Sequence, residues 1–282
     1  MQFRPGRVMG VLNVTPDSFS DGGRFIDPAA AVAHGRRLVE EGADWVDVGG
    51  ESTRPGADPV PADEEMRRVL PVIEALAVSG AQVSIDTRKP EVAEAAVAAG
   101  ARMINDVSAG LADVAAASGV AFVAMHMRGD PATMQAEPVY DDVVAEVRDF
   151  LVERAEAARD AGVREVWIDP GIGFGKTLDH NLDLLANLDV LAAAGFPLLV
   201  GTSRKTTLGR LAARADGSDA VPPPGDRLAG SVATAAWAYR CGATMVRAHD
   251  VAATVWAAEA VVASAGGAGA GSFSKEGARW HR

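Results

Sequence analysis

Cysteine and long hydrophobic runs are scarce in this chain of 282 residues, and each scarcity excludes a class of protein. The single cysteine, Cys241, excludes an internal disulfide and a cysteine-based zinc site, and it fits a reducing compartment. No apolar run approaches the ~18 residues that a membrane span requires, because Gly195 and Pro197 interrupt the longest one. The N-terminus lacks the apolar segment of a signal peptide. We therefore expect a cytoplasmic protein that has no membrane partner.

Positive charge is scarce as well. The chain carries 27 lysines and arginines against 38 aspartates and glutamates, which gives a formal net charge of −11. This balance disfavours a nucleic-acid partner, which would require a basic surface. Only four cations are lysines: Lys89, Lys176, Lys205 and Lys275. An anionic ligand would therefore need a few lysines and arginines to converge at one place.

Short buried strands alternate with Ala-rich helical segments along the chain. Eight apolar, β-branched runs lack the strict alternation of a one-sided sheet, and they cover residues 8–14, 45–49, 82–86, 102–107, 121–126, 165–169, 197–203 and 243–249. Helical spacing of apolar residues occupies segments between them, which include 28–41, 61–78, 90–99, 140–161, 181–194, 228–240 and 252–264. Eight strand–helix units predict one (β/α)8 TIM barrel, since a doubly wound sheet usually has about five or six strands.

Two segments fall outside this repeat. Residues 213–226 contain Gly217 and three consecutive prolines, so we expect an exposed insertion in the seventh unit. Residues 266–282 begin with a Gly-Ala repeat and predict a flexible tail. The barrel domain is accordingly expected to span residues 1–265.

Polar residues follow or end every predicted strand. In a TIM barrel the loops after the strands build the active site, so these side chains would converge on one mouth. Loops are polar in most proteins, because they lie in solvent, and a single polar residue there indicates little. The indication is stronger for Asp86, Asn105, Asp169 and Arg247, which occupy the last positions of the strands themselves. The pattern predicts an enzyme with its active site at the carboxyl end of the strands.

Three of these residues offer hydrogen-bond acceptors. Asp86, Asn105 and Asp169 suit a neutral heterocycle whose N–H and amino groups need partners, because a carboxylate binds a guanidine-like edge in a bidentate, charge-assisted way. Magnesium is the alternative occupant, since the two aspartates and Asn13 could ligate it. The stretch 169–177 resembles a nucleotide-binding loop, but Pro170 stands where that motif requires glycine.

The best candidate for an anion site lies after the last two strands. Lys205 precedes Thr206 at the start of a helix, whose backbone N–H groups attract negative charge. Arg247 and His249 follow the eighth strand, and these loops form the common phosphate site of TIM barrels. Taken alone, His249 could equally be a buried structural histidine. Arg54 precedes Pro-Gly and is expected on a loop.

Seven motifs together resemble the dihydropteroate synthase family. They occupy residues 9–23, 47–56, 84–90, 104–107, 169–176, 201–205 and 247–250, in the family's order. The first two, MGVLNVTPDSFSDGG and DVGGESTRPG, are long enough to be highly specific. The family condenses (7,8-dihydropterin-6-yl)methyl diphosphate with 4-aminobenzoate to give 7,8-dihydropteroate and diphosphate in folate biosynthesis, and sulfonamides target it.

The resemblance implies a role for each site residue. The pterin would be held by Asp86, Asn105, Asp169 and Lys205, and the cofactor Mg²⁺ by Asn13. The diphosphate would be held by Thr53, Arg54, Arg247 and His249, and the aminobenzoate by Phe19, Thr53, Pro55, Lys205 and Thr206. Asp86, Lys205, Arg54 and Arg247 would be the catalytic residues. A homodimer formed through helices near the C-terminus is also implied.

Two other functions remain open on the sequence. One is a pterin-binding methyltransferase that passes a methyl group to a corrinoid partner, which would share Asp86, Asn105 and Asp169 but would not need a diphosphate site. The other is a regulatory relative that binds pterin without catalysis. Release of diphosphate from the pterin substrate distinguishes the three.

Overall fold

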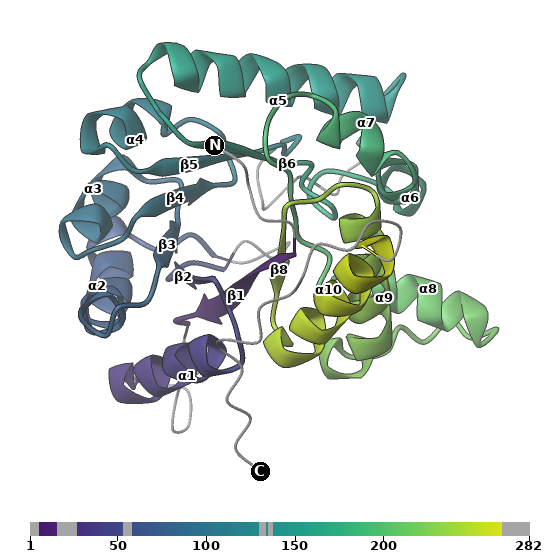
Figure 1. The fold of residues 1–282 in the computed structure, drawn as a ribbon, viewed down its shortest axis with the longest axis horizontal. Coiled ribbons are helices and arrows are strands. Elements are labelled where there is room, and N and C mark those ends of the chain that lie inside the picture. The colour runs from purple at the N-terminus through teal and green to yellow at the C-terminus, as the bar shows by residue number, and fades with distance from the viewer. Residues whose placement is uncertain (1–5, 16–26, 53–57, 130–133, 135–137, 267–282) are drawn as a thin grey trace.

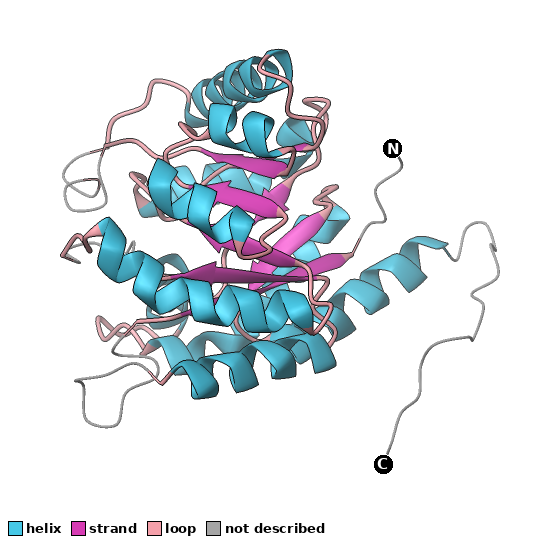
Figure 2. Cartoon of the chain, turned by 90° about the vertical axis from the view of Figure 1, so that its left-hand side faces the viewer, coloured by secondary structure: helices cyan, strands magenta, loops and turns pink. Residues whose placement is uncertain are grey.

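Eight parallel strands form one sheet inside a ring of helices (Figures 1 and 2). The computed structural model describes residues 6–15, 27–52, 58–129, 134 and 138–266. The strands are β1 (Arg7–Asn13), β2 (Trp45–Gly49), β3 (Val83–Asp86), β4 (Met103–Asp106), β5 (Ala121–Met125), β6 (Val166–Asp169), β7 (Leu199–Val200) and β8 (Met245–Ala248). Their order is β6-β5-β4-β3-β2-β1-β8-β7, and a bridge between Ile168 and Leu198 joins the two edge strands. The predicted (β/α)8 barrel is confirmed.

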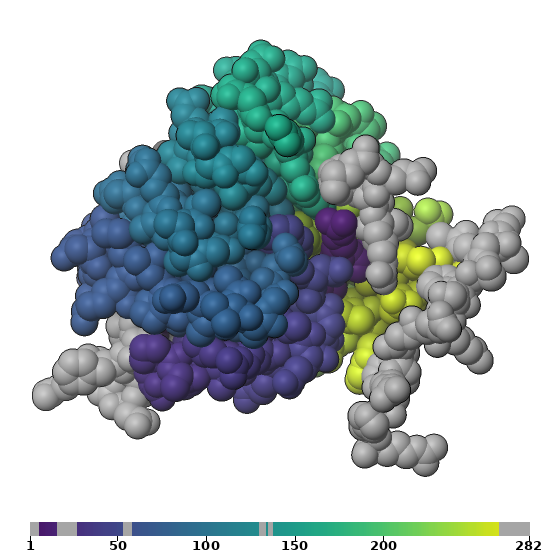
Figure 3. Space-filling model, turned by 60° about the vertical axis from the view of Figure 1, so that its left-hand side comes forward, coloured from purple at the N-terminus to yellow at the C-terminus, as the bar shows by residue number. Residues whose placement is uncertain are grey.

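The helices cover the outer face of this sheet. They are α1 (Pro28–Glu40), α2 (Ala62–Val78), α3 (Pro90–Ala98), α4 (Ala112–Ser118), α5 (Val143–Asp160), α6 (Leu178–Ala186), α7 (Leu188–Ala192), α8 (Thr206–Ala215), α9 (Leu228–Arg240) and α10 (Val251–Gly266), with a short 3₁₀ helix, η1 (Pro224–Arg227). In the space-filling view the surface runs without a break from purple α1 through blue α2 and α3 to teal (Figure 3). No helix in the described part of the chain is long and apolar enough to cross a membrane.

Local sequence explains where the helices begin. The side chain of Asp142 accepts hydrogen bonds from the first turn of α5, and Thr177 forms a capping box with His180 at α6. The segment predicted as one helix over 181–194 is in fact α6 and α7, which are separated at Asn187. At Asn187 the backbone leaves the helical region, with φ −119° and ψ 31°, and the Asn187 side chain donates to the carbonyl of Asp183.

Two predicted boundaries differ from the structure. The strand expected over 197–203 is only the two residues of β7, because the backbone turns after Gly201 and the Lys205 N–H donates to the Thr202 carbonyl. In the expected insertion, residues 213–215 form the last turn of α8, and Ala213 is buried. Residues 214–221 are exposed. Most of the predicted tail, 267–282, lies outside the described residues.

The sheet has two cores, one on each face. Outside the barrel, aliphatic residues of the strands pack against the helices. Inside the barrel a smaller cluster fills the lower part, and it consists of Met9, Met103, Ala121, Val123, Trp167, Leu199 and Met245. Side chains of a strand alternate between its faces, so the residue two positions after an inward-facing one also faces inward. This rule places Asn105, Asp169 and Arg247 directly above the inner cluster, at the carboxyl end of the barrel.

Candidate active site

Strand register brings the predicted acceptors side by side. Asn13 is paired with Gly49, and Gly49 with Asp86 on the next strand. Asp86 is in turn paired with Asn105. Because the strands are parallel, the carboxyl end of each one meets the same mouth of the barrel. The convergence that the sequence predicts is therefore present for the described residues.

Arg247 joins two carboxylates at the floor of this mouth. Its Nε lies 2.6 Å from Oδ2 of Asp47, and its Nη2 lies 2.7 Å from Oδ2 of Asp86. Asn105 Nδ2 donates to the same Asp47 oxygen over 2.9 Å. The four side chains therefore form one hydrogen-bonded network that spans β2, β3, β4 and β8.

Asp47 was not among the predicted site residues, because it is in the middle of β2 and not at the end of the strand. The signal was available: a carboxylate inside the apolar run WVDVG is unusual, and a fully buried charge requires a partner. Asp47 is 0% exposed. Its position in β2 directs the Asp47 side chain into the barrel, at the same height as the predicted site residues.

Burial changes the protonation of the network. It raises the pKa of Asp86 to about 7, against the opposing effect of Arg247 and with the help of the neighbouring Asp47 charge. Although burial favours a neutral Arg247, the carboxylates of Asp47 and Asp86 raise its pKa. Arg247 therefore stays cationic while Asp86 titrates near neutrality.

Lys205 lies near Arg247, on the other side of Gly201, and against the loop that follows β6. Its ammonium donates to the carbonyl of Ile172 and lies 4.6 Å from the centre of the Phe174 ring. Burial lowers the pKa of Lys205 to about 8, although the Asp169 carboxylate acts in the other direction. Burial likewise raises the pKa of Asp169, which Lys205 opposes.

The loop after β6 is built from glycines that lie against the loop after β5. At Gly171, with φ +63°, a Cβ atom would lie 1.9 Å from the carbonyl oxygen of His126, so only glycine fits. Lys176 ties the two loops together: its buried ammonium binds Nδ1 of His126 at 2.9 Å and the carbonyls of Gly171 and Phe174. Burial lowers the pKa of Lys176 to about 7. Lys176 therefore holds backbone carbonyls of the two loops.

The predicted anion groups lie beside Lys205. His249 follows β8, and both its backbone N–H and its Nδ1 contact Oγ of Ser203 at 3.1 Å. Thr206 is the first residue of α8 and is exposed, and no side chain caps the N–H groups of this helix. These N–H groups remain available to an anion.

Four predicted residues, Phe19, Thr53, Arg54 and Pro55, lie outside the described residues. Residues on either side of 53–57 are joined by hydrogen bonds and ion pairs. The Glu51 carboxylate accepts from the backbone N–H of Val60 and from Nζ of Lys89, each over 2.7 Å. Lys89 also pairs with the buried Glu65. Sequence reasoning did not select Glu51 or Lys89, and neither lies at a predicted substrate position.

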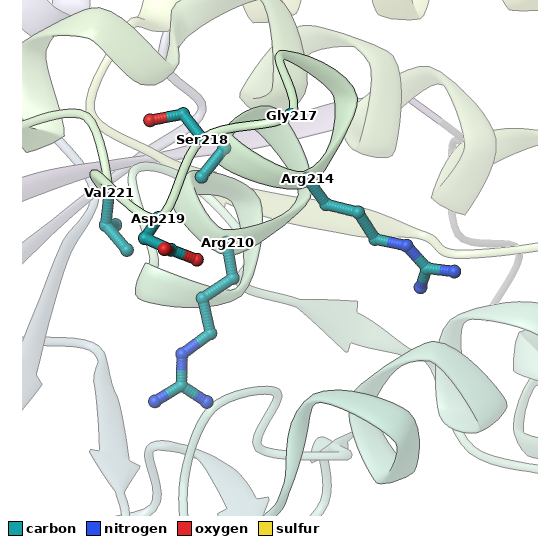
Figure 4. A pocket seen from close by; sticks show the side chains of 7 residues that line it. Arg210, Arg214, Gly217, Ser218, Asp219 and Val221 are labelled. Carbon is teal, nitrogen blue, oxygen red and sulfur yellow. The ribbon is translucent and has the colours of Figure 1, made fainter.

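Two cavities lie elsewhere on the molecule. One, of about 510 Å³, is lined by residues near the end of α8, among them Arg210, Arg214 and Asp219 (Figure 4). The other, of about 690 Å³, is lined by residues at the amino ends of the strands, including Trp45 and Arg102. Neither contains a predicted site residue. The convergent polar groups, and not these cavities, define the candidate site.

This arrangement defines a class of protein: a TIM-barrel enzyme that binds a polar small molecule among paired carboxylates, an amide and cations at the carboxyl end of its strands. Comparison with known proteins specifies the family. Residues 9–249 match the family described as "Pterin binding enzyme". The dihydropteroate synthase of Mycobacterium leprae is 51% identical over 269 residues, which cover 93% of this chain and 94% of that protein.

Solved structures agree with this match. That of Xanthomonas albilineans dihydropteroate synthase in complex with 7,8-dihydropteroate has a TM-score of 0.81 and 51% identity, and covers 93% of this chain and 94% of that one. The Yersinia pestis dihydropteroate synthase with a sulfonamide drug has a TM-score of 0.85 and 44% identity, with coverage of 93% and 94%. The chain belongs to the pterin binding enzymes, and within them to the dihydropteroate synthases, which are transferases.

Proposed function

We propose that this protein condenses (7,8-dihydropterin-6-yl)methyl diphosphate with 4-aminobenzoate, releasing diphosphate and forming 7,8-dihydropteroate. One observation carries the proposal: the acceptors Asp86, Asn105 and Asp169 and the cations Arg247 and Lys205 share one barrel mouth. The 2-amino-pyrimidinone edge of a pterin presents N–H donors, which carboxylate and amide oxygens bind. A diphosphate requires cations and N–H donors, which Arg247, the His249 ring and the uncapped start of α8 would supply.

The proposed mechanism is loss of diphosphate before attack by the amine. The leaving group departs from a methylene conjugated to an electron-rich ring, so C–O cleavage leaves a cation that the ring delocalises. Asp86 and Asp169 would stabilise this cation, and Arg247 and Arg54 the departing diphosphate. The nitrogen of 4-aminobenzoate then attacks the methylene and loses a proton to solvent. An aniline nitrogen is a sufficient nucleophile for such a cation, so a strong general base is not required.

Magnesium fits this site as a cofactor that is shared with the substrate. Among the described residues no group of three or more His, Cys, Asp or Glu side chains could hold a metal ion. We therefore propose a site in which the substrate supplies part of the ligands. Mg²⁺ usually keeps several waters and takes only about one or two protein oxygens together with substrate phosphate. The Asn13 amide oxygen is of the required hard type, and it lies at the mouth beside Gly49. When bound, the ion would neutralise charge on the leaving diphosphate.

The assay that tests this proposal is direct. Protein, Mg²⁺, the pterin diphosphate and 4-aminobenzoate are mixed, and diphosphate and 7,8-dihydropteroate are quantified. We expect equal amounts of both products and loss of turnover on adding EDTA, with recovery when Mg²⁺ is restored in excess. Pterin binding without diphosphate release would favour the regulatory alternative. Methyl transfer to a corrinoid would favour the methyltransferase.

We expect a narrow pH optimum. Asp86, with a pKa raised to about 7, must be a carboxylate to bind a donor edge, so activity falls as the pH drops through this value. Lys205, with a pKa lowered to about 8, must be an ammonium, so activity falls again as the pH rises through that value. The measurement is kcat/KM for the pterin diphosphate across this range. Melting temperatures at each pH control for unfolding, and a flat profile would contradict both assignments.

Three further properties belong to the proposal. Sulfonamides are expected to compete with 4-aminobenzoate, in line with the drug complex of the Yersinia pestis relative. The cytoplasm is the expected compartment because Cys241 is a free thiol, and cell fractionation tests this.

A homodimer is expected through the C-terminal helices, where Trp237 on α9 and Trp256 on α10 are 50% and 62% exposed. Light scattering of wild type and of Trp256→Glu tests it: the variant should have half the mass of wild type.

A further inference from the structure

Asp47 is a buried charge that the proposed reaction does not use directly. Its carboxylate is fully buried, and only one of its two oxygens has hydrogen-bond partners, namely Asn105 and Arg247. The second oxygen, Oδ1, is buried with no partner in the described structure. A buried ion pair often contributes less to stability than well-packed apolar residues in place of both partners would. Asp47 therefore needs an explanation other than stability.

One of the two neighbours of Asp47 is Asn105. An amide can turn either its NH₂ or its oxygen toward a partner, but a carboxylate can only accept. Asp47 therefore draws Nδ2 of Asn105 toward itself, and Oδ1 of Asn105 is left as the free acceptor. No hydrogen bond to Oδ1 of Asn105 occurs among the described residues. A pterin presents N–H groups at its edge, and such an edge requires this orientation of the amide.

Asp47 also determines which part of Arg247 stays available. Nε of Arg247 is held by Asp47 and Nη2 by Asp86, so the plane of the guanidinium is fixed by carboxylates on two adjacent strands. Within the described part of the chain, Nη1 donates to nothing. One carboxylate thus contacts both a residue assigned to the pterin and a residue assigned to the diphosphate.

We propose that Asp47 is a positioning residue of this enzyme: through its contact with Asn105 it fixes that amide as an acceptor, and so selects ligands whose edge donates hydrogen bonds. The proposal rests on the pterin-binding function proposed above. It assigns to Asp47 no contact with the substrate. Its effect passes through Asn105, and to a smaller degree through Arg247.

Two substitutions of Asp47 separate its acceptor role from its charge. Leucine has the branching of aspartate without an acceptor, so Asp47→Leu frees Asn105 to rotate. Asp47→Asn retains one acceptor oxygen for Nδ2 of Asn105, but removes the charge and places an NH₂ group where the unpartnered Oδ1 lies. By calorimetry with 7,8-dihydropteroate, we expect Asp47→Leu to raise Kd by about 10- to 100-fold, the range typical of residues that orient a ligand-binding side chain. Asp47→Asn should stay within about threefold of wild type.

Steady-state kinetics provide a readout that general structural damage would not reproduce. Asp47→Leu should raise KM for the pterin diphosphate and leave KM for 4-aminobenzoate unchanged, whereas a distorted barrel would change both. The urea midpoint of Asp47→Leu should be lower than that of wild type, because Nε of Arg247 and Nδ2 of Asn105 lose their buried acceptor. If the leucine variant does not fold, Asp47→Ala, which cannot overfill the barrel, takes its place.

A double-mutant cycle decides the route of the effect. In an Asn105→Ala background the change Asp47→Leu should alter Kd by no more than about twofold, since the residue through which it acts is gone. Full additivity of the two changes would overturn the proposal, and so would wild-type affinity in Asp47→Leu. The wild-type protein is the control for the underlying function: if it does not bind 7,8-dihydropteroate, the proposed function fails, independently of Asp47.

Discussion

Replacing Asp86 by asparagine is expected to reduce kcat by about 100- to 1,000-fold, the loss typical when one group that stabilises developing charge is removed. Asparagine has nearly the same shape, but it has no charge to oppose the pterin cation. It also presents an N–H group where the pterin edge requires an acceptor. Turnover is measured as diphosphate released per enzyme, with Asp183→Asn on the exposed face of α6 as the matched control. Asp183 lies away from the mouth, and its variant should match wild type.

The stability of Asp86→Asn should not fall along with its activity. Burial raises the pKa of Asp86 to about 7. Above this pH Asp86 is ionised in the folded protein, although its ionisation costs less free energy in the unfolded chain. Asp86 therefore reduces the free energy of unfolding at alkaline pH, and asparagine removes that penalty. Arg247 keeps its partner Asp47. We expect an unchanged or higher melting temperature at pH about 8. Turnover close to that of wild type would remove Asp86 from the pterin site.

Repeating strand–helix patterns made the barrel predictable, because each unit carries its own signal of apolar periodicity. The acceptors at strand ends were predictable for a related reason: parallel strands place their carboxyl ends together whatever the details of packing. For Asp86, Asn105 and Arg247 the structure shows this convergence directly. Their assignment to a particular part of the substrate still rests on the family.

What the sequence could not supply are contacts between residues that are distant along the chain. Asp47 and Arg247 are 200 positions apart, and only closure of the barrel between β1 and β8 brings them together. The pairing of Glu51 with Lys89 likewise depends on how two loops meet. Such pairwise contacts modify a periodic signal without appearing in it.

Lys205→Met should produce the second large loss. Methionine keeps most of the length and apolar character of the side chain but removes the ammonium that binds the Ile172 carbonyl and lies against Phe174. Asp169 then loses the cation that holds its pKa down, so more of it is protonated at neutral pH. We expect kcat/KM for the pterin diphosphate to fall by about 100-fold or more. Binding of 7,8-dihydropteroate should weaken as well.

Arg210→Met is the matched control, because it removes a cation from α8, the helix that Lys205 directly precedes, at an exposed position that lines the separate pocket of Figure 4. If net positive charge near α8 were all that mattered, both variants would lose activity to a similar degree. If the position of the Lys205 ammonium matters, only Lys205→Met is impaired, and Lys205→Arg recovers little. Gly173 and Gly201 lie close to this side chain, since an added Cβ would be 3.3 Å from Cδ and 3.7 Å from Nζ of Lys205 respectively. A planar guanidinium does not reproduce the compact charge of an ammonium at this place. Wild-type kinetics in Lys205→Met would show that the cation is not part of the catalytic site.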